Sequence, residues 1–149
     1  MPENLEIRPA NLADHDAILY CLVEMSKEAD SIVDEPDWFK VSHIITEQVR
    51  QGLVFVAVTE QGVIGTIGLT QSAEWYSNQP IIGDLWFFVL KEHRASGAAY
   101  KLLKHVRDLA QAENIKLKVG HVLGYSVDKL DKFYGRLGFT RTGTLYRLE

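Results

Sequence analysis

The sequence predicts an α/β fold of the α+β kind, with a sheet that mixes antiparallel and parallel strands. Two strand patterns, at 53–60 and 63–74, flank a two-residue turn and indicate an antiparallel hairpin. The run "IIGDLWFFVL" (81–90) is apolar on both faces, as is typical of a central buried strand. Strand, helix and strand patterns then alternate to the end of the chain, which implies some parallel pairing.

The first third of the chain is predicted to form one strand and two helices. "LEIRPA" (5–10) alternates apolar and polar residues and ends at Pro9. Asn11 is expected to cap a helix over 12–29, whose apolar residues recur at helical spacing. A second amphipathic helix is predicted over 38–51.

The segment after the hairpin and the central strand is predicted to contain two more helices. The first covers 95–113 and carries Ala, Leu and Val residues on one face. A strand over 116–123 and a short helix over 126–137 follow. The last residues, 139–149, are predicted to supply one or two closing strands.

Composition restricts the classes of function. The 149 residues suit one domain, 1–149, and the net charge of -4 argues against nucleic-acid binding, which favours a basic face. The single cysteine, Cys21, excludes an intrachain disulfide and suits a reducing cytosol. No apolar run approaches the length of a membrane span, so we expect a cytoplasmic protein without a membrane partner.

A cluster of small residues lies between the central strand and the helix that follows it. It reads Arg94, Ala95, Ser96, Gly97, Ala98 and Ala99. A helix N-terminus with small side chains lets a phosphate approach bare N–H groups, and an arginine adds positive charge. The alternative is that small residues only allow close packing of the helix on the sheet. The P-loop and the full dinucleotide-binding motif are both absent from the sequence.

Two segments, "VLKEHRASGAA" (89–99) and "FYGRLGF" (133–139), together resemble the GNAT N-acetyltransferase superfamily. In that family the first motif reads Arg or Gln, two residues, Gly, one residue, then Gly or Ala. The order of predicted elements is similar to the family's over nearly the whole chain. The resemblance implies a mixed, mostly antiparallel central sheet, splayed in the middle and flanked by helices on both faces.

The resemblance also implies acetyl-CoA as the acetyl donor and a primary amine as the acceptor. In the family the pantetheine arm pairs with the backbone of the central strand, here Phe87, Phe88 and Val89. The pyrophosphate would lie on the backbone of residues 94–99. Tyr134 stands at the position that commonly acts as general acid. Lys101, Lys104 and Arg136 are candidates for the 3′-phosphate of CoA, although solvated helix faces explain them equally.

The general base is less defined. Asp84 is expected near the start of the central strand, on the face shared by Trp86 and Phe88. Relatives often carry an acid in this neighbourhood that works directly or through water. Glu74 and His121 are alternative bases, and a structural role for His121 is also open. The five histidines show no metal-ligand spacing, so no metal is expected.

The acceptor region is predicted from two loops, because relatives build it before the central strand and between the first two helices. The helix–helix loop here holds Asp30, Asp34, Glu35 and Asp37, and the aromatic residues around the two loops are Trp38, Phe39, Trp75 and Tyr76. Acids and aromatic faces together suit a cationic amine, on a small molecule or on a protein. A homodimer is compatible with the sequence.

Two other functions stay open. The family often has an asparagine near Val127 that touches the cofactor, and this chain has none. A catalytically silent module that binds acyl-CoA is therefore one alternative. An interaction domain without a cofactor is the other.

Overall fold

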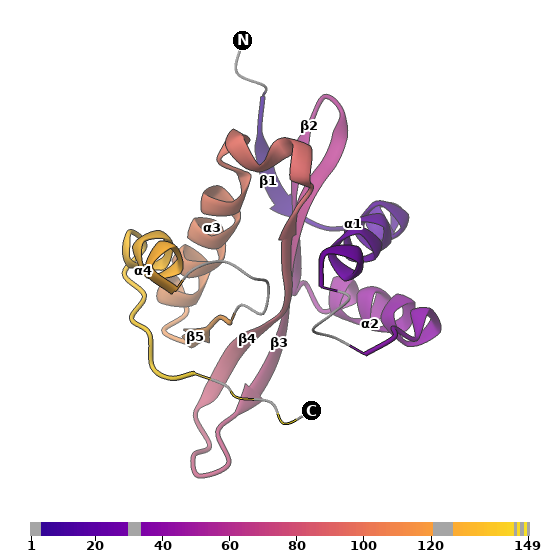
Figure 1. Cartoon of the computed structure of the whole chain (residues 1–149). Helices are drawn as coiled ribbons and strands as arrows, with labels where there is room; N and C mark the ends of the chain where they lie inside the picture. The colour runs from indigo at the N-terminus through magenta and orange to yellow at the C-terminus, as the bar shows by residue number, and fades with distance from the viewer. Residues whose placement is uncertain (1–3, 30–33, 121–126, 145, 147, 149) are drawn as a thin grey trace.

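The protein is described from a computed structural model, which describes residues 4–29, 34–120, 127–144, 146 and 148. A curled five-stranded sheet forms its centre, and helices cover both faces (Figure 1). The strands are β1 (Glu6–Pro9), β2 (Val54–Thr59), β3 (Gly62–Ala73), β4 (Pro80–Val89) and β5 (Lys116–Lys118). The helices are α1 (His15–Glu28), α2 (Trp38–Arg50), α3 (Ala98–Ala112) and α4 (Val127–Gly135), and two short 3₁₀ helices are η1 (Leu12–Asp14) and η2 (Lys91–Ser96).

The sheet order confirms the predicted fold class. The strands lie in the order β1-β2-β3-β4-β5, with antiparallel pairing from β1 to β4 and parallel pairing between β4 and β5. The β4–β5 pairing covers only Ile81 to Gly83. Within the described residues, β4 from Asp84 to Val89 is therefore paired on its β3 edge alone. β5 ends at Lys118, opposite Gly83, so the described part of this strand lies beside only the first residues of β4.

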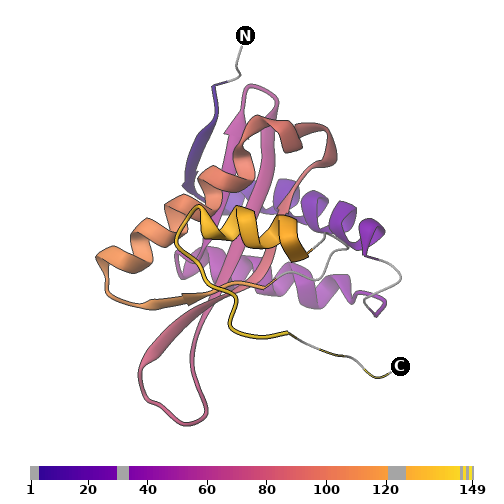
Figure 2. The same cartoon turned by 60° about the vertical axis from the view of Figure 1, so that its left-hand side comes forward.

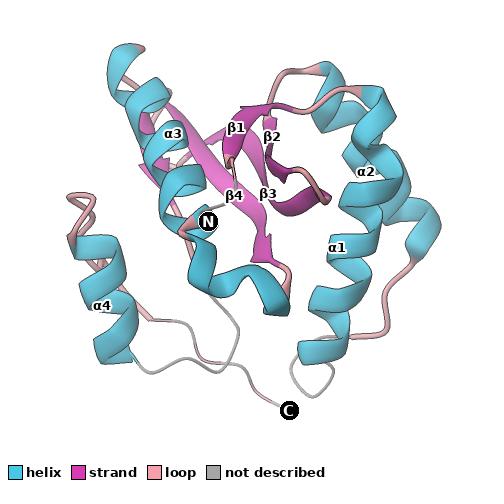
Figure 3. Cartoon of the chain, turned by 90° about the horizontal axis from the view of Figure 1, so that it is seen from above, coloured by secondary structure: helices cyan, strands magenta, loops and turns pink. Residues whose placement is uncertain are grey.

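The helices form two layers around the sheet. Seen from above, α1 and α2 lie on one side of the sheet and α3 and α4 on the other (Figure 3). Figure 2 brings the α3 and α4 side forward. The core on the α1 and α2 side includes Ile18, Leu22, Ile45, Val56 and Trp86. The core on the α3 side includes Phe55, Ile67, Leu69, Val89, Leu102 and Val106.

Asn11 forms a cap as predicted, but it caps the short 3₁₀ helix η1, and α1 begins only at His15 and not at residue 12. The Asn11 side chain accepts a hydrogen bond from the N–H of Ala13, and Asp14 accepts one from the N–H of Asn11 in return. Arg8 of β1 pairs with the same Asp14 carboxylate at 2.7 Å, which ties the first strand to this turn. At α2, the carboxylate of Asp37 accepts from the N–H groups of the first turn. Each cap satisfies donors that the helix itself leaves unpaired.

A β-bulge in β4 decides which face each following side chain occupies. Gly68 of β3 pairs with Trp86, whereas the next residue, Leu69, pairs with Asp84, so Leu85 is the extra residue. A Cβ at Gly68 would lie 2.2 Å from the Trp86 ring, so only glycine fits there. Neighbouring residues of β3 face opposite ways. Asp84 and Trp86 therefore lie on opposite faces of the sheet.

Several predicted elements differ from those in the structure. The helix predicted over 95–113 begins at Ala98, because η2 and a left-handed Gly97 precede it. The described part of β5 ends at Lys118, short of the predicted 116–123. None of the described residues from 139 onward is in a strand, although closing strands were predicted there.

Candidate active site

The turn between β4 and α3 presents an open backbone. Gly97 has φ +85°, and no heavy atom lies within 4 Å of the place where a Cβ would stand. The first N–H groups of α3 have no acceptor inside the helix. Ser96 Oγ accepts from the Ala98 N–H and donates to the His93 carbonyl, which fixes the turn. An anion can therefore approach this end of α3 without meeting a side chain at Gly97.

Arg94 links this turn to its neighbours β4 and α1. Its Nε donates to the Val89 carbonyl at 3.1 Å, and its Nη2 donates to Glu28 Oε2 at 2.6 Å. Its guanidinium also lies over the Phe88 ring, 5.1 Å from the centroid. The positive charge predicted near the turn is present, and it forms an ion pair with Glu28 of α1. Arg94 therefore connects η2 to β4 through Phe88 and Val89, and to α1 through Glu28.

Helix α4 presents Tyr134 from an aromatic cluster. The Tyr134 ring meets Phe133 and Phe139 edge to face, at 5.2 and 5.8 Å between centroids. Phe133 in turn lies 6.4 Å from Phe87 of β4. After α4 the chain turns at Gly138, which has φ +86°, and the Phe139 N–H returns to the Tyr134 carbonyl. These contacts set the position of the Tyr134 ring relative to β4.

The α4 segment is also fastened to α3. Leu137 is fully buried, and its carbonyl accepts a hydrogen bond from Arg107 Nη1 of α3 at 3.3 Å. Burial of the leucine removes apolar area from water, which stabilises the docked helix. The position of Tyr134 therefore depends on packing against both the sheet and α3.

The environment of Tyr134 keeps its phenol protonated. Partial burial raises the pKa of Tyr134 to about 12, and the negative charge of Asp84 contributes to the same shift. The hydroxyl therefore carries its proton at neutral pH. A protonated phenol can donate to a developing anion, which is what a general acid does.

Asp84 lies on the face opposite to the one predicted for it. The bulge at Leu85 separates it from Trp86 and Phe88 and turns it to the side of the sheet that α3 and α4 cover. Its Oδ1 accepts a hydrogen bond from the Gly120 N–H at 3.0 Å, just beyond the end of β5. Burial raises the pKa of Asp84, and the backbone hydrogen bonds offset part of that rise. The two candidate catalytic residues therefore share one face.

The two alternative bases are placed differently. Glu74 is the first residue of the β3–β4 loop, and its Oε1 forms an ion pair with Lys118 Nζ at 2.6 Å. This lysine already neutralises the Glu74 carboxylate. His121 lies outside the described residues. Asp84 is the candidate whose charge acts on Tyr134.

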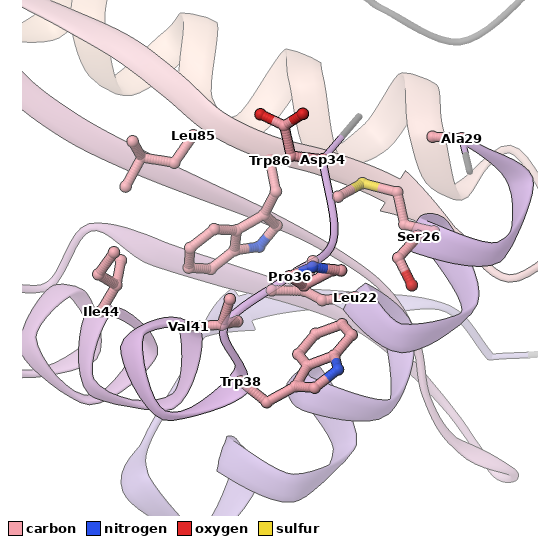
Figure 4. Close-up of a pocket in the computed structure, with 11 residues that line it drawn as sticks. Leu22, Ser26, Ala29, Asp34, Pro36, Trp38, Val41, Ile44, Leu85 and Trp86 are labelled. Carbon is pink, nitrogen blue, oxygen red and sulfur yellow. The ribbon is translucent and has the colours of Figure 1, made fainter. Parts of the chain in front are cut away.

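Only part of the predicted acceptor region surrounds a pocket. Asp34 and Trp38 line a cavity of about 340 Å³ between α1, α2 and β4 (Figure 4). Asp37 instead caps α2, and Asp30 lies outside the described residues. The aromatic residues predicted elsewhere are exposed, with Phe39 at 92% and Trp75 at 95%. Tyr76 is also exposed and packs edge to face on Trp75.

Sequence reasoning missed most of the residues that line this pocket. They are Leu22, Met25, Ser26, Ala29, Pro36, Val41, Ile44, Leu85 and Trp86. The apolar stripes of the first two helices predict burial, but they do not distinguish a packed core from a cavity wall. Leu85 lines the pocket because of the bulge, and the sequence pattern does not predict a bulge at this position.

The described residues contain neither a candidate metal site nor a candidate membrane-spanning helix. No three His, Cys, Asp or Glu side chains there come together in a way that could hold a metal ion. In the same ranges, no helix combines the length and the apolar character needed to cross a membrane.

Comparison with known proteins adds a family match. A family model described as an acetyltransferase (GNAT) domain matches residues 50–141. This range contains β2 to β5, the Gly97 turn and α4. No match is found among curated proteins.

Solved structures show the same fold over almost the whole chain. One is a possible acetyltransferase from Clostridium difficile 630, with 19% identity, a TM-score of 0.73 and 97% coverage of each chain. Another is an aminoglycoside acetyltransferase from an uncultured soil metagenomic sample, with 17% identity, a TM-score of 0.69 and coverage of 97% and 94%. A third is a ribosomal-protein-alanine N-acetyltransferase from Brucella melitensis biovar Abortus 2308, with 16% identity, a TM-score of 0.69 and coverage of 97% and 98%.

Proposed function

The chain belongs to the GNAT acetyltransferase family, and on this premise we propose that it transfers the acetyl group of acetyl-CoA to a primary amine by direct attack. The observation that carries the proposal is the placement of Tyr134 and Asp84. Both lie on the side of the sheet that α3 and α4 cover, and the charge of Asp84 acts on Tyr134. The acetyltransferases with the same fold support an amine acceptor, since their substrates include an aminoglycoside and a ribosomal protein.

The chain has suitable groups to hold acetyl-CoA. The backbone from Arg94 to Ala99 would take the pyrophosphate, because Gly97 leaves the helix end open. The β4 edge at Phe87, Phe88 and Val89, which has no strand partner among the described residues, would pair with the pantetheine arm, as an added strand does. When bound, acetyl-CoA supplies an acetyl thioester that an amine can attack.

Two side chains would then carry out the two proton transfers of the reaction. Tyr134 donates its phenolic proton to the thiolate as the carbon–sulfur bond breaks, and its raised pKa keeps that proton available. Asp84 accepts the proton that the attacking ammonium must lose, directly or through water. Burial raises the pKa of Asp84 and makes the carboxylate a stronger base than an exposed one.

An amine screen tests the proposed function. We expect the purified chain to release free thiol from acetyl-CoA when a suitable primary amine is present, and to release little without one. Mass spectrometry of the amine should show one added acetyl group. Binding of acetyl-CoA with no transfer to any amine class would instead indicate the silent binding module. Failure to bind acetyl-CoA at all would indicate an interaction domain.

Replacement of Asp84 by asparagine separates its catalytic role from its effect on stability. Burial raises its native pKa, so the ionised carboxylate destabilises the folded state above that pKa, and this cost is absent below the unfolded pKa of about 4. We expect Asp84→Asn to melt at a higher temperature than the native chain at neutral pH. The gain should disappear as the pH falls below about 4.

The same substitution should lower kcat at neutral pH by about 10²-fold, at the low end of the effect of a general base. Part of the loss should be recovered at higher pH, where the free amine is itself deprotonated. Glu74→Gln is the matched control, since it removes the other candidate acid. Unchanged kcat in Asp84→Asn with a tenfold or larger loss in Glu74→Gln would contradict the assignment.

A further inference from the structure

The turn that would receive the pyrophosphate has little buried surface to hold it in place. None of the residues of η2, Lys91–Ser96, is buried. The His93 N–H donates to the Leu90 carbonyl at 2.9 Å, and Ser96 Oγ donates to the His93 carbonyl at 2.6 Å, but both bonds stay within the turn and its first residues. A segment without buried side chains keeps one shape through its polar contacts to neighbouring elements. The contacts of Arg94 therefore bear on the shape of this turn.

Arg94 reaches from the turn to one particular edge of β4. The Leu90 N–H donates to the Ile64 carbonyl of β3 at 2.8 Å. Because the backbone groups of successive residues in a strand point to alternate edges, the Val89 carbonyl points away from β3. Arg94 Nε donates to this carbonyl at 3.1 Å. The arginine therefore connects the turn to the same edge of β4 that would pair with the pantetheine arm.

Glu28 fixes the orientation of the guanidinium. Its Oε2 accepts from Arg94 Nη2 at 2.6 Å, and the two side chains are only about one third exposed. Nε and Nη2 lie on one edge of the rigid guanidinium plane, so a single orientation serves both Val89 and Glu28. The guanidinium also lies over the ring of Phe88, which is buried together with Cys21 of α1. Two acceptors and one aromatic ring therefore define where Arg94 lies.

The position of Glu28 does not favour the helix that carries it. Glu28 is the last residue of α1. A carboxylate there meets the negative end of the helix dipole, which is unfavourable, and Arg94 offsets this from another element. Glu24, one turn earlier, instead pairs with Lys27 of the same helix at 3.1 Å. The contact of Glu28 thus serves the turn after β4, whereas the contact of Glu24 stays within α1.

From these contacts we propose that Glu28 is a positioning residue for acetyl-CoA. It holds Arg94 on the Val89 carbonyl, and Arg94 keeps the turn in the shape that lets the N–H groups at the start of α3 receive the pyrophosphate. The inference rests on the proposed function for the identity of the cofactor. A turn that is ordered before binding loses less conformational freedom on binding, so the Glu28–Arg94 pair raises the affinity for acetyl-CoA.

Calorimetric titration with acetyl-CoA tests the role of Glu28. Glu28→Gln keeps the length and an acceptor oxygen but loses the charge, and we expect it to bind acetyl-CoA about fivefold more weakly. Glu24→Gln is the matched control, because it changes the net charge equally on the same helix, and it should bind like the native chain. Tighter binding by Glu28→Gln would overturn the proposal, since Glu28 would then compete with the pyrophosphate for Arg94. Unchanged binding in folded protein would overturn it as well.

A double-mutant cycle tests whether Glu28 acts through Arg94. Arg94→Lys keeps the positive charge but cannot present two N–H groups of one rigid plane to Val89 and Glu28. In the Arg94→Lys background, Glu28→Gln should therefore change the affinity for acetyl-CoA little further. An equal loss in both backgrounds would show that Glu28 acts independently of Arg94, and the positioning role would be wrong.

Steady-state kinetics separate positioning from a general loss of structure. In Glu28→Gln the KM for acetyl-CoA should rise, while kcat at saturating acetyl-CoA and the KM for the amine stay near their native values. This split is expected because Glu28 and Arg94 touch neither Tyr134 nor Asp84 in the contacts described above. A fall in kcat without a change in the KM for acetyl-CoA would contradict the proposal.

Hydrogen exchange of the ligand-free chain measures the order of the turn directly. The amides of residues 95–99 should exchange faster in Glu28→Gln than in the native chain or in Glu24→Gln, and equal rates in all three would refute the inference. If the native chain does not bind acetyl-CoA, the proposed function fails, and these rates still decide whether Glu28 holds the turn. If amines are acetylated but Glu28→Gln binds acetyl-CoA as the native chain does, the function stands and the positioning role is wrong.

Discussion

Replacement of Tyr134 by phenylalanine is expected to lower kcat by roughly 10²- to 10⁴-fold, the range for loss of a general acid. The change removes the hydroxyl and keeps the ring, so the edge-to-face contacts with Phe133 and Phe139 stay. Acetyl-CoA affinity should change little, because the Gly97 turn lies on another element. Steady-state kinetics with a saturating amine, together with calorimetry for acetyl-CoA, measure the two effects.

The raised pKa of Tyr134 gives a second readout for this variant. A phenol with a pKa of about 12 holds its proton through neutral and mildly alkaline pH, so the native enzyme should not lose activity there through this group. An acyl donor with a more acidic leaving thiol needs less proton donation and should partly restore Tyr134→Phe. Phe139→Leu is the matched control for packing. A near-normal kcat in Tyr134→Phe, with chemistry limiting, would assign Tyr134 to packing alone.

The sequence predicted the layout of the fold because its signals are local. Apolar alternation, a two-residue turn and helix caps such as Asn11 are each encoded within a few residues. The prediction of closing strands was wrong because local signals do not decide whether a strand finds a partner. Residues 139–144 have strand-like composition, but pairing depends on a partner edge at a distance, which no local pattern specifies.

The sequence predicted several residues of the candidate site, but it did not predict how they are arranged in space. Residue types identified Tyr134 and the Gly97 turn, since both belong to short motifs. The face of Asp84 was wrong, because one extra residue, Leu85, reverses every side chain beyond it. Arg94 was expected to serve a phosphate, and its partners Glu28 and Val89 could not be read from spacing. The apolar pocket arises from helix packing and likewise has no local signal.

Replacement of Gly97 by glutamate should weaken acetyl-CoA binding by about 10²-fold or more. The side chain would extend into the open space at the start of α3, and its carboxylate would occupy the region of partial positive charge that favours a phosphate. Calorimetric titration with acetyl-CoA measures the loss. Binding of CoA itself should fall equally, because both molecules carry the same pyrophosphate.

The left-handed backbone at Gly97 requires a control for strain. With φ +85°, any side chain there costs on the order of 1–2 kcal/mol of stability. Gly97→Ala carries that strain without bulk or charge, and Gly97→Gln adds the bulk without the charge. We expect all three variants to melt at similar, lower temperatures, while acetyl-CoA affinity falls in the order Ala, Gln, Glu. Folded Gly97→Glu protein that binds acetyl-CoA as tightly as Gly97→Ala would show that the pyrophosphate does not lie at this turn.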